Sequence, residues 1–218
     1  ILKQSLLHRV IKTGYMFTVG TKNESTRANW LEATLKKIPS GTKILDAGAG
    51  ECQFKKFCTH LDYVSQDFAQ YTGSGDAGLQ TGTWDNSRID IVSDIVSIPV
   101  ADASFDTVMC TEVLEHIPDP IAAFRELHRI LKPGGNLILT SPFASLTHFA
   151  PYHYATGFNR FFYEYHLPKT GFEITELSMN GNYFEFVAQE IRRIKQVAKM
   201  YTNKRVNILE KVFMQGVL

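Results

Sequence analysis

The stretch KILDAGAG at residues 43–50 decides the fold of this chain, because an apolar run there ends directly in a glycine turn. The apolar part predicts a short buried strand, and helical spacing resumes at Phe54, Phe57 and Cys58. Gly48 and Gly50 permit turn dihedrals that other residues avoid, and they let the backbone approach a ligand closely. The helix expected after the turn would favour a carboxylate or a phosphate at its N-terminus.

Strands and helices alternate along the rest of the chain. Strands are expected over 63–66, 90–92, 105–110, 136–140 and 172–177, and helices over 25–38, 120–131 and 183–201. Alternation of this kind predicts an α/β fold, a Rossmann-like doubly wound and mostly parallel sheet with helices on both faces. The glycine-rich segment 71–86 predicts a connecting surface loop, with a lid over a bound ligand as the alternative.

Length and composition limit the class of protein. The 218 residues, 44% of them hydrophobic, predict a single domain over 1–218. Its expected parts are an N-terminal helical region (1–40), a core that carries the glycine turn (41–143), an aromatic-rich segment (144–170), and a last strand with a basic helix (171–218). Lys and Arg number 23 against 22 Asp and Glu, so no global charge attracts nucleic acid.

The cysteines and the apolar runs indicate the compartment. Cys52, Cys58 and Cys110 are too few for a disulfide framework, so we expect a reducing, cytoplasmic setting. Cys52, Cys58 and His60 lack the paired spacing of zinc ligands, and the sequence predicts no metal site. No stretch approaches the roughly 18 uninterrupted apolar residues of a membrane helix, and charges interrupt residues 1–12.

Polar residues follow the predicted strands, and they are Asp46, Asp67, Asp94, Thr111 and Glu112. The carboxyl ends of parallel strands meet at one edge of a sheet, so we expect these residues to be neighbours. Asp67 ends the second strand, where a carboxylate can accept both hydroxyl protons of a ribose. The pattern predicts a nucleoside ligand, and a Gly-x-Gly turn that merely closes a strand onto a helix is the alternative.

Five motifs in order resemble the class I S-adenosylmethionine-dependent methyltransferases, particularly the type 11, ubiquinone-biosynthesis-like branch that acts on small molecules. They are ILDAGAG at 44–50, Asp67, the pair Asp94 and Ile95, FDTVMCTEVLEHI at 105–117, and LKPGG at 131–135. The resemblance implies a seven-strand sheet, S-adenosylmethionine as cofactor with S-adenosylhomocysteine as product, and a small-molecule acceptor. No seventh strand is evident before Leu218, so we expect a truncated chain.

The resemblance also implies roles for individual residues. The methionine part of the cofactor would be held by Asp46, Ala47, Gly48 and Gly50. The ribose would be held by Asp67 with Phe68 beside it, the adenine by Asp94 with Ile95, and the floor near the sulfonium would be formed by Thr111 and Glu112. One departure from the family is Cys52, which stands where a third glycine is usual.

Two alternatives to this enzyme remain open from the residues. A nicotinamide-dependent oxidoreductase needs Gly-x-Gly-x-x-Gly, and Gln53 stands at the position of its third glycine. Asp46 beside the turn suits an ammonium group and would repel a pyrophosphate. The other alternative is a methyltransferase-like binding or scaffold protein without turnover, and it is disfavoured by the presence of both glycines and the strand-end carboxylates.

The aromatic-rich stretch 143–172 follows the fifth strand and is expected to line the acceptor pocket. In related methyltransferases this region commonly binds the acceptor, so the substrate-side candidates are Tyr152, Arg160 and Tyr163. The candidates for acid or base catalysis are His148, His153 and His116. The alternatives are that His116 fixes the turn after its strand, and that Phe161, Phe162 and Phe172 pack a helix onto the sheet.

Basic residues gather near the C-terminus, at Arg192, Arg193, Lys195, Lys199, Lys204, Arg205 and Lys211. We expect a solvated helix face there. An anionic partner, such as a membrane surface, a nucleic acid or a phosphorylated carrier, is the alternative. The oligomeric state is not predicted.

Overall fold

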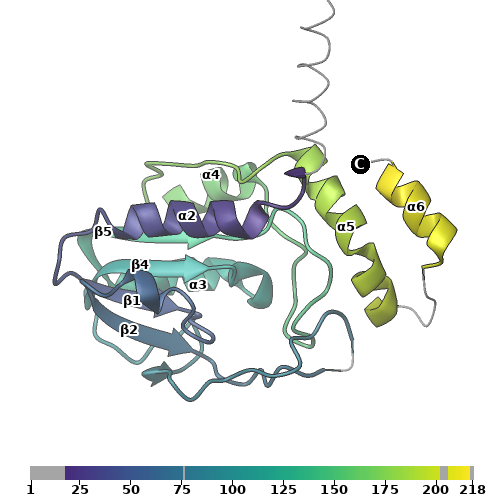
Figure 1. The fold of residues 1–218 in the computed structure, drawn as a ribbon. Coiled ribbons are helices and arrows are strands. Elements are labelled where there is room, and N and C mark those ends of the chain that lie inside the picture. Colours follow the sequence, from purple (N-terminus) through teal and green to yellow (C-terminus); the bar gives the residue numbers. More distant parts are fainter. Residues whose placement is uncertain (1–17, 76, 202–205, 217–218) are drawn as a thin grey trace, which may run out of the picture. The chain divides into compact units, whose positions relative to one another are not determined.

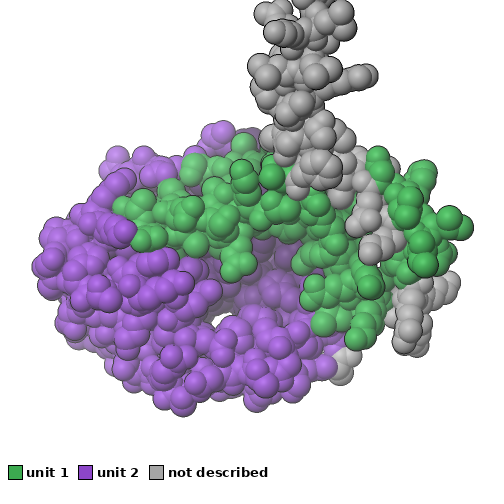
Figure 2. Space-filling view, in the orientation of Figure 1, with its two compact units in different colours: residues 1–33, 178–218 green, residues 34–177 purple. Residues whose placement is uncertain are grey.

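The computed structural model describes residues 18–75, 77–201 and 206–216. The chain divides into two compact units, unit 1 over Ile1–Ala33 and Ser178–Leu218, and unit 2 over Thr34–Leu177 (Figure 2). The interpretation of residues 1–12, and the basic residues Lys204 and Arg205, lie outside the described residues.

Five parallel strands form the sheet of unit 2 (Figure 1). They are β1 (Lys43–Ala47), β2 (Asp62–Asp67), β3 (Ile91–Val92), β4 (Phe105–Thr111) and β5 (Leu131–Thr140). Their order is β3-β2-β1-β4-β5, so the direction of winding reverses between β1 and β4. Ligands bind outside the carboxyl ends of the strands at such a reversal. The predicted parallel α/β fold is confirmed, and the described residues hold five of the seven strands expected.

The core of unit 2 lies between the sheet and the helices α3 (Pro120–Ile130) and α4 (Arg160–Lys169). Asp119 caps α3 by accepting the backbone N–H groups of Ile121 and Ala122, and Pro120 suits the first helical turn. Helical spacing then buries Phe124 and its apolar neighbours against the strands. This packing fixes the carboxyl edge of the sheet.

Helix α4 corrects one expectation about the aromatic residues. Asn159 caps the helix by accepting the N–H of Phe162, whose ring packs 6.0 Å from that of Phe124. Phe162 therefore joins helix to core as expected, whereas Phe161 points outward and is 69% exposed. Adjacent helical positions face about 100° apart, so both residues cannot reach the same core.

Two predicted elements are absent from the described structure. The expected helix after the glycine turn is a single 3-10 turn, η1 (Lys55–Phe57), between Gly50 and β2. The expected strand over 172–177 is not a strand; Phe172 instead donates its N–H to the Leu167 carbonyl and extends the end of α4. Alternating hydrophobicity predicted burial of one face but could not supply a pairing partner.

Strand β5 begins earlier than expected. Its first residue, Leu131, pairs with Phe105, and the regular register resumes where Thr107 meets Asn136. Gly134 and Gly135 lie within this irregular part of the strand, and they do not form a separate loop after α3. The segment that the sequence presents as a stop signal is therefore the irregular start of a strand.

Unit 1 contains most of α2 (Asn23–Leu35), together with α5 (Tyr183–Tyr201) and α6 (Ile208–Gly216). The predicted helices over 25–38 and 183–201 correspond to α2 and α5. Arg192 donates to the Val19 carbonyl at 2.8 Å, so this basic side chain is engaged inside the unit. None of the described helices combines the length and the apolar character that crossing a bilayer requires.

Candidate functional site

The glycine turn after β1 is tied to the end of β2. Gly48 and Gly50 both have positive φ, at 75° and 52°. Gly50 N–H donates to Asp67 Oδ2 at 2.9 Å, and Ala69 N–H donates to Asp67 Oδ1 at 2.8 Å. Asp67 is only 8% exposed, so both oxygens are held in place while each keeps a further lone pair. The arrangement presents a fixed carboxylate beside the turn.

Asp46 is a buried carboxylate one strand away. Its Oδ2 accepts the Tyr63 hydroxyl at 2.7 Å, while Oδ1 has no hydrogen-bond partner among the described residues. Burial raises the pKa of Asp46 to about 7, and the nearby charge of Asp67 adds to the rise, whereas the Tyr63 hydroxyl opposes it. A buried acceptor without a partner favours a cationic or hydrogen-bonding ligand.

The ends of β3 and β4 lie at the same edge. Glu112 has a positive φ of 56° and is held there by β5, since its N–H donates to the Thr140 carbonyl at 2.9 Å. Thr111 just before it is buried. Asp94 follows β3 and accepts the N–H of Val96, while the side chain of Ile95 is buried in the core. The structure thus brings the predicted strand-end residues to one edge of the sheet.

Three histidines gather where β4 ends. His116 closes the short helix η2 (Leu114–His116), and its ring lies 4.7 Å from that of His148 and 5.8 Å from that of His153. His116 Nδ1 contacts the Tyr152 carbonyl at 2.5 Å, so Nδ1 carries the hydrogen and Nε2 the lone pair in the neutral ring. The sequence separates these histidines, and the loop after β5 brings them together.

Buried Glu115 lies next to these rings. Its Oε1 is 3.7 Å from His116 Nε2 and 3.9 Å from His148 Nε2. Each of these three residues offers an atom that could hold a metal ion, and the atoms lie within 4.8 Å of one another. Glu115 was not among the predicted site residues, although its place beside His116 after a buried strand was a signal for it.

His116 and His153 are both shifted toward the neutral form. Burial lowers the pKa of His116 to about 4, against the opposing effect of its bond to the Tyr152 carbonyl. Burial and the neighbouring His148 also lower the pKa of His153. At neutral pH both rings are therefore uncharged, and His153, which is half-buried, also contacts the Ser145 hydroxyl at 3.2 Å.

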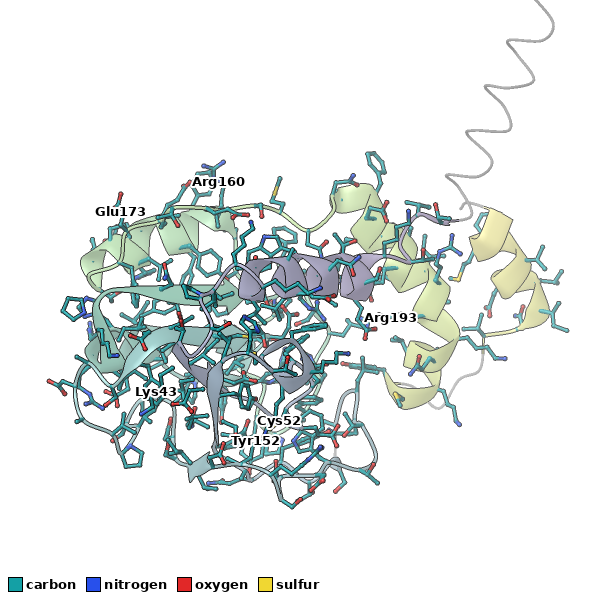
Figure 3. The ribbon with its side chains drawn as sticks, turned by 60° about the vertical axis from the view of Figure 1, so that its left-hand side comes forward. Lys43, Cys52, Tyr152, Arg160, Glu173 and Arg193 are labelled. Atoms are coloured by element: carbon teal, nitrogen blue, oxygen red, sulfur yellow. The ribbon has the colours of Figure 1, made fainter. Side chains whose placement is uncertain are left out.

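The substrate-side candidates are only partly brought together. The ring of Tyr152 meets that of Phe68 at 4.8 Å, beside Asp67. Tyr163 is buried with its hydroxyl bonded to Ser141, and burial raises its pKa to about 12. Arg160 is exposed on α4, paired with Glu164, and Figure 3 shows it well apart from Tyr152.

The loop 71–86 reaches this site by packing against the loop after β5. Leu79 forms an isolated parallel bridge with His148. Tyr71 stacks on Phe149 at 4.4 Å, and Phe149 stacks on His116 at 5.1 Å. Sequence reasoning missed these aromatic neighbours, since nothing local indicates that the two loops would pair.

Comparisons with known proteins agree with this geometry. Residues 45–139 match the family model described as methyltransferase domain. A ubiquinone biosynthesis O-methyltransferase of Xanthomonas axonopodis pv. citri is 32% identical over 125 residues, covering 53% of this chain and 48% of that protein. The chain spans about half the length of this curated relative.

Two solved structures share the fold. The [4+2]-cyclase SpnF has a TM-score of 0.51 and 20% identity, covering 79% of this chain and 68% of that one. Phosphoethanolamine N-methyltransferase 2 of Haemonchus contortus, in complex with S-adenosyl-L-methionine, has a TM-score of 0.50 and 22% identity. The match covers 76% of this chain and 42% of that one. Residues 45–139 of this chain are therefore similar to the methyltransferase domain family.

Proposed function

We propose that this protein transfers a methyl group from S-adenosylmethionine to an oxygen of a small-molecule acceptor. The hydrogen-bonded pair of Asp67 and Gly50, at the point where the sheet reverses, carries the proposal. The family match over residues 45–139 supports the donor, and the printed name of the curated relative, an O-methyltransferase, supports oxygen as the acceptor atom.

The residues present fit the donor. Asp67 offers two fixed carboxylate oxygens for ribose hydroxyls, and the Asp46 oxygen without a hydrogen-bond partner offers an acceptor for an ammonium group. Asp94 and the Ile95 backbone lie at the same edge and would hold the adenine, with Thr111 and Glu112 as the proposed floor. When bound, the cofactor supplies a methyl group already activated by positively charged sulfur, so the protein's main task is alignment.

The histidine cluster would receive the proton that a hydroxyl acceptor loses. His153 and His148 are the proposed proton acceptors because they lie on the loop that follows β5, on the acceptor side. His116 is better suited to positioning, since its Nδ1 holds the Tyr152 carbonyl and its pKa is strongly lowered. Tyr152 and Phe149 would exclude water from the transfer, which strengthens electrostatic interactions there.

Binding and turnover test the proposal in two steps. Calorimetry with S-adenosylmethionine and S-adenosylhomocysteine measures donor binding, and mass spectrometry of hydroxyl-bearing acceptors then detects the gain of one methyl group. Failure of both ligands to bind would reject the proposal. Binding without turnover on any acceptor would favour the alternative of a methyltransferase-like protein that does not transfer methyl groups. The [4+2]-cyclase that shares this fold shows that the fold also occurs in a protein named for a different reaction.

We also propose a reducing, cytoplasmic setting. Its support is that all three cysteines are free and buried. Labelling with a thiol reagent, in the native and the unfolded protein, would test the reduced and buried state of the cysteines on which this proposal rests: thiols accessible only after unfolding are expected.

A further inference from the structure

The indole of Trp84 covers the glycine turn. A Cβ placed on Gly50 would lie 2.6 Å from Trp84 Cζ2 and 3.4 Å from Cη2, so only glycine leaves room for the ring. Trp84 is half-buried, so part of its ring is open to a ligand or to solvent. The Cζ2 edge of the indole therefore stands directly against the turn that forms the donor side of the site.

The turn itself holds Trp84 in this position. Glu51 accepts the backbone N–H of Asp85 at 3.1 Å, and its carbonyl accepts from the Arg88 guanidinium at 3.2 Å. Both contacts join the residues beside Trp84 to the residue that follows Gly50. The loop that carries the indole is thus held to the glycine turn by two hydrogen bonds, both on the C-terminal side of Trp84.

Other aromatic rings support the indole from behind. Trp84 meets Tyr71 at 5.5 Å and 70°, and Phe149 at 5.0 Å and 67°, in edge-to-face contacts. Tyr71 is itself fixed, because its hydroxyl donates to Gln80 at 2.7 Å. The Trp84 ring is therefore a preorganised wall, and this wall continues through Phe149 to the histidine cluster.

The position of this wall relative to Asp67 suggests what it contacts. Gly50, which the indole covers, donates its N–H to the carboxylate proposed to bind the ribose. In S-adenosylmethionine a single carbon separates the ribose ring from the sulfonium. A side chain that adjoins the ribose anchor is therefore within reach of the sulfur. The face of an indole attracts a cation, whereas it has no such attraction for an uncharged thioether.

We propose that Trp84 contacts the sulfonium of the donor and makes the site prefer S-adenosylmethionine to its uncharged product, S-adenosylhomocysteine. This inference rests on the proposed function. Such a preference helps turnover, because the product loses the contact when the positive charge leaves the sulfur. Asp46 and Asp67 also face this side of the turn, and they too favour a cation, so the test must isolate the aromatic contribution.

Two substitutions separate the aromatic face from the bulk of the side chain. Trp84→Leu keeps an apolar side chain but removes the ring, and Trp84→Phe keeps a smaller aromatic face. The measurement is the ratio of the dissociation constants of the product and of the donor for each variant, by calorimetry. We expect Trp84→Leu to lower this ratio by roughly threefold to thirtyfold, and Trp84→Phe to lower it less.

The chain's two tryptophans allow a readout without any change at Trp84. In a Trp30→Phe background the emission comes from Trp84 alone, and it should change when either ligand saturates the protein. This measurement stands even where Trp84→Leu fails to fold.

The outcomes are distinct. An unchanged ratio in Trp84→Leu, or equal weakening of both ligands, would show that Trp84 only packs and would overturn the inference while leaving the proposed function intact. If Trp84 emission in the Trp30→Phe background does not change when either ligand binds, the inference is overturned as well. If neither ligand binds the unmodified protein, the proposed function fails, and this inference fails with it.

Discussion

Replacing Asp67 by asparagine should weaken the donor site and the fold by separable amounts. The carboxylate accepts two backbone N–H groups, from Gly50 at 2.9 Å and from Ala69 at 2.8 Å, and the side chain is 8% exposed. An amide has one oxygen, so one N–H would face an NH₂ group instead of an acceptor. The lost charge-assisted bond should cost about 1.5–3 kcal/mol of unfolding free energy.

The same substitution should also weaken ligand binding by a comparable free energy, through lost hydrogen bonds to the ribose. In the unmodified protein the ribose hydroxyls can donate to two carboxylate oxygens, whereas in Asp67→Asn only one amide oxygen can accept. We expect the dissociation constant of S-adenosylhomocysteine to rise by roughly fivefold to 150-fold, which corresponds to about 1–3 kcal/mol. Calorimetry gives the dissociation constant, and urea denaturation gives the free energy of unfolding.

Asp90 provides the matched control for Asp67→Asn. Its Oδ2 accepts the Ser65 N–H at 2.9 Å and the Ser65 hydroxyl at 2.7 Å, and these bonds lower its pKa. Asp90 precedes β3 and lies outside the proposed donor site. Asp90→Asn should therefore lose stability and keep its affinity. A folded Asp67→Asn protein that binds the ligand within about twofold of the unmodified protein would refute the assignment of Asp67 to the ribose.

The other predictions concern titration and proton transfer. Tyr63→Phe removes a hydrogen bond that lowers the pKa of Asp46, so this pKa should rise above about 7, and donor affinity should fall at pH 7 and recover toward higher pH in calorimetry. Because the pKa of His116 is lowered from 6.5 to about 4, its contribution to stability is full above about pH 6.5. That contribution should decrease as the pH falls toward 4, by on the order of 3 kcal/mol in urea denaturation, and His116→Gln should flatten the profile. His148→Ala and His153→Ala should each lower kcat without changing the dissociation constant of the product; if both variants keep the full kcat, neither histidine accepts the proton.

The part of the fold nearest the donor could be predicted from local sequence. Strands β1 and β4 are apolar runs buried in the sheet, and each ends in a polar residue or a glycine turn. Parallel pairing then places Asp46, Asp67 and Glu112 at one edge without any information about loops. The edge follows from strand direction alone, and strand direction follows from the alternation of strands and helices.

Elements whose existence depends on a partner could not be predicted in this way. The spacing of Phe54, Phe57 and Cys58 is helical, yet only the short 3-10 turn η1 forms before β2. The segment 172–177 alternates in hydrophobicity, yet none of the described strands pairs with it. Periodicity indicates which face of a segment is buried, whereas the neighbouring backbone decides whether a strand forms there.

The acceptor side depends most on contacts that the sequence does not encode locally. His116 lies against His148 of the loop after β5, and Leu79 pairs with His148 and thereby joins the loops after β2 and β5. Neither loop has a regular period, so no pattern could have predicted that Trp84 would stand over Gly50. On the proposals above, the strands determine where the donor would bind, and the paired loops would determine which charge and which acceptor the site prefers. Substitutions that disturb this loop pairing should alter specificity before they alter the fold, because the sheet core has no part in it.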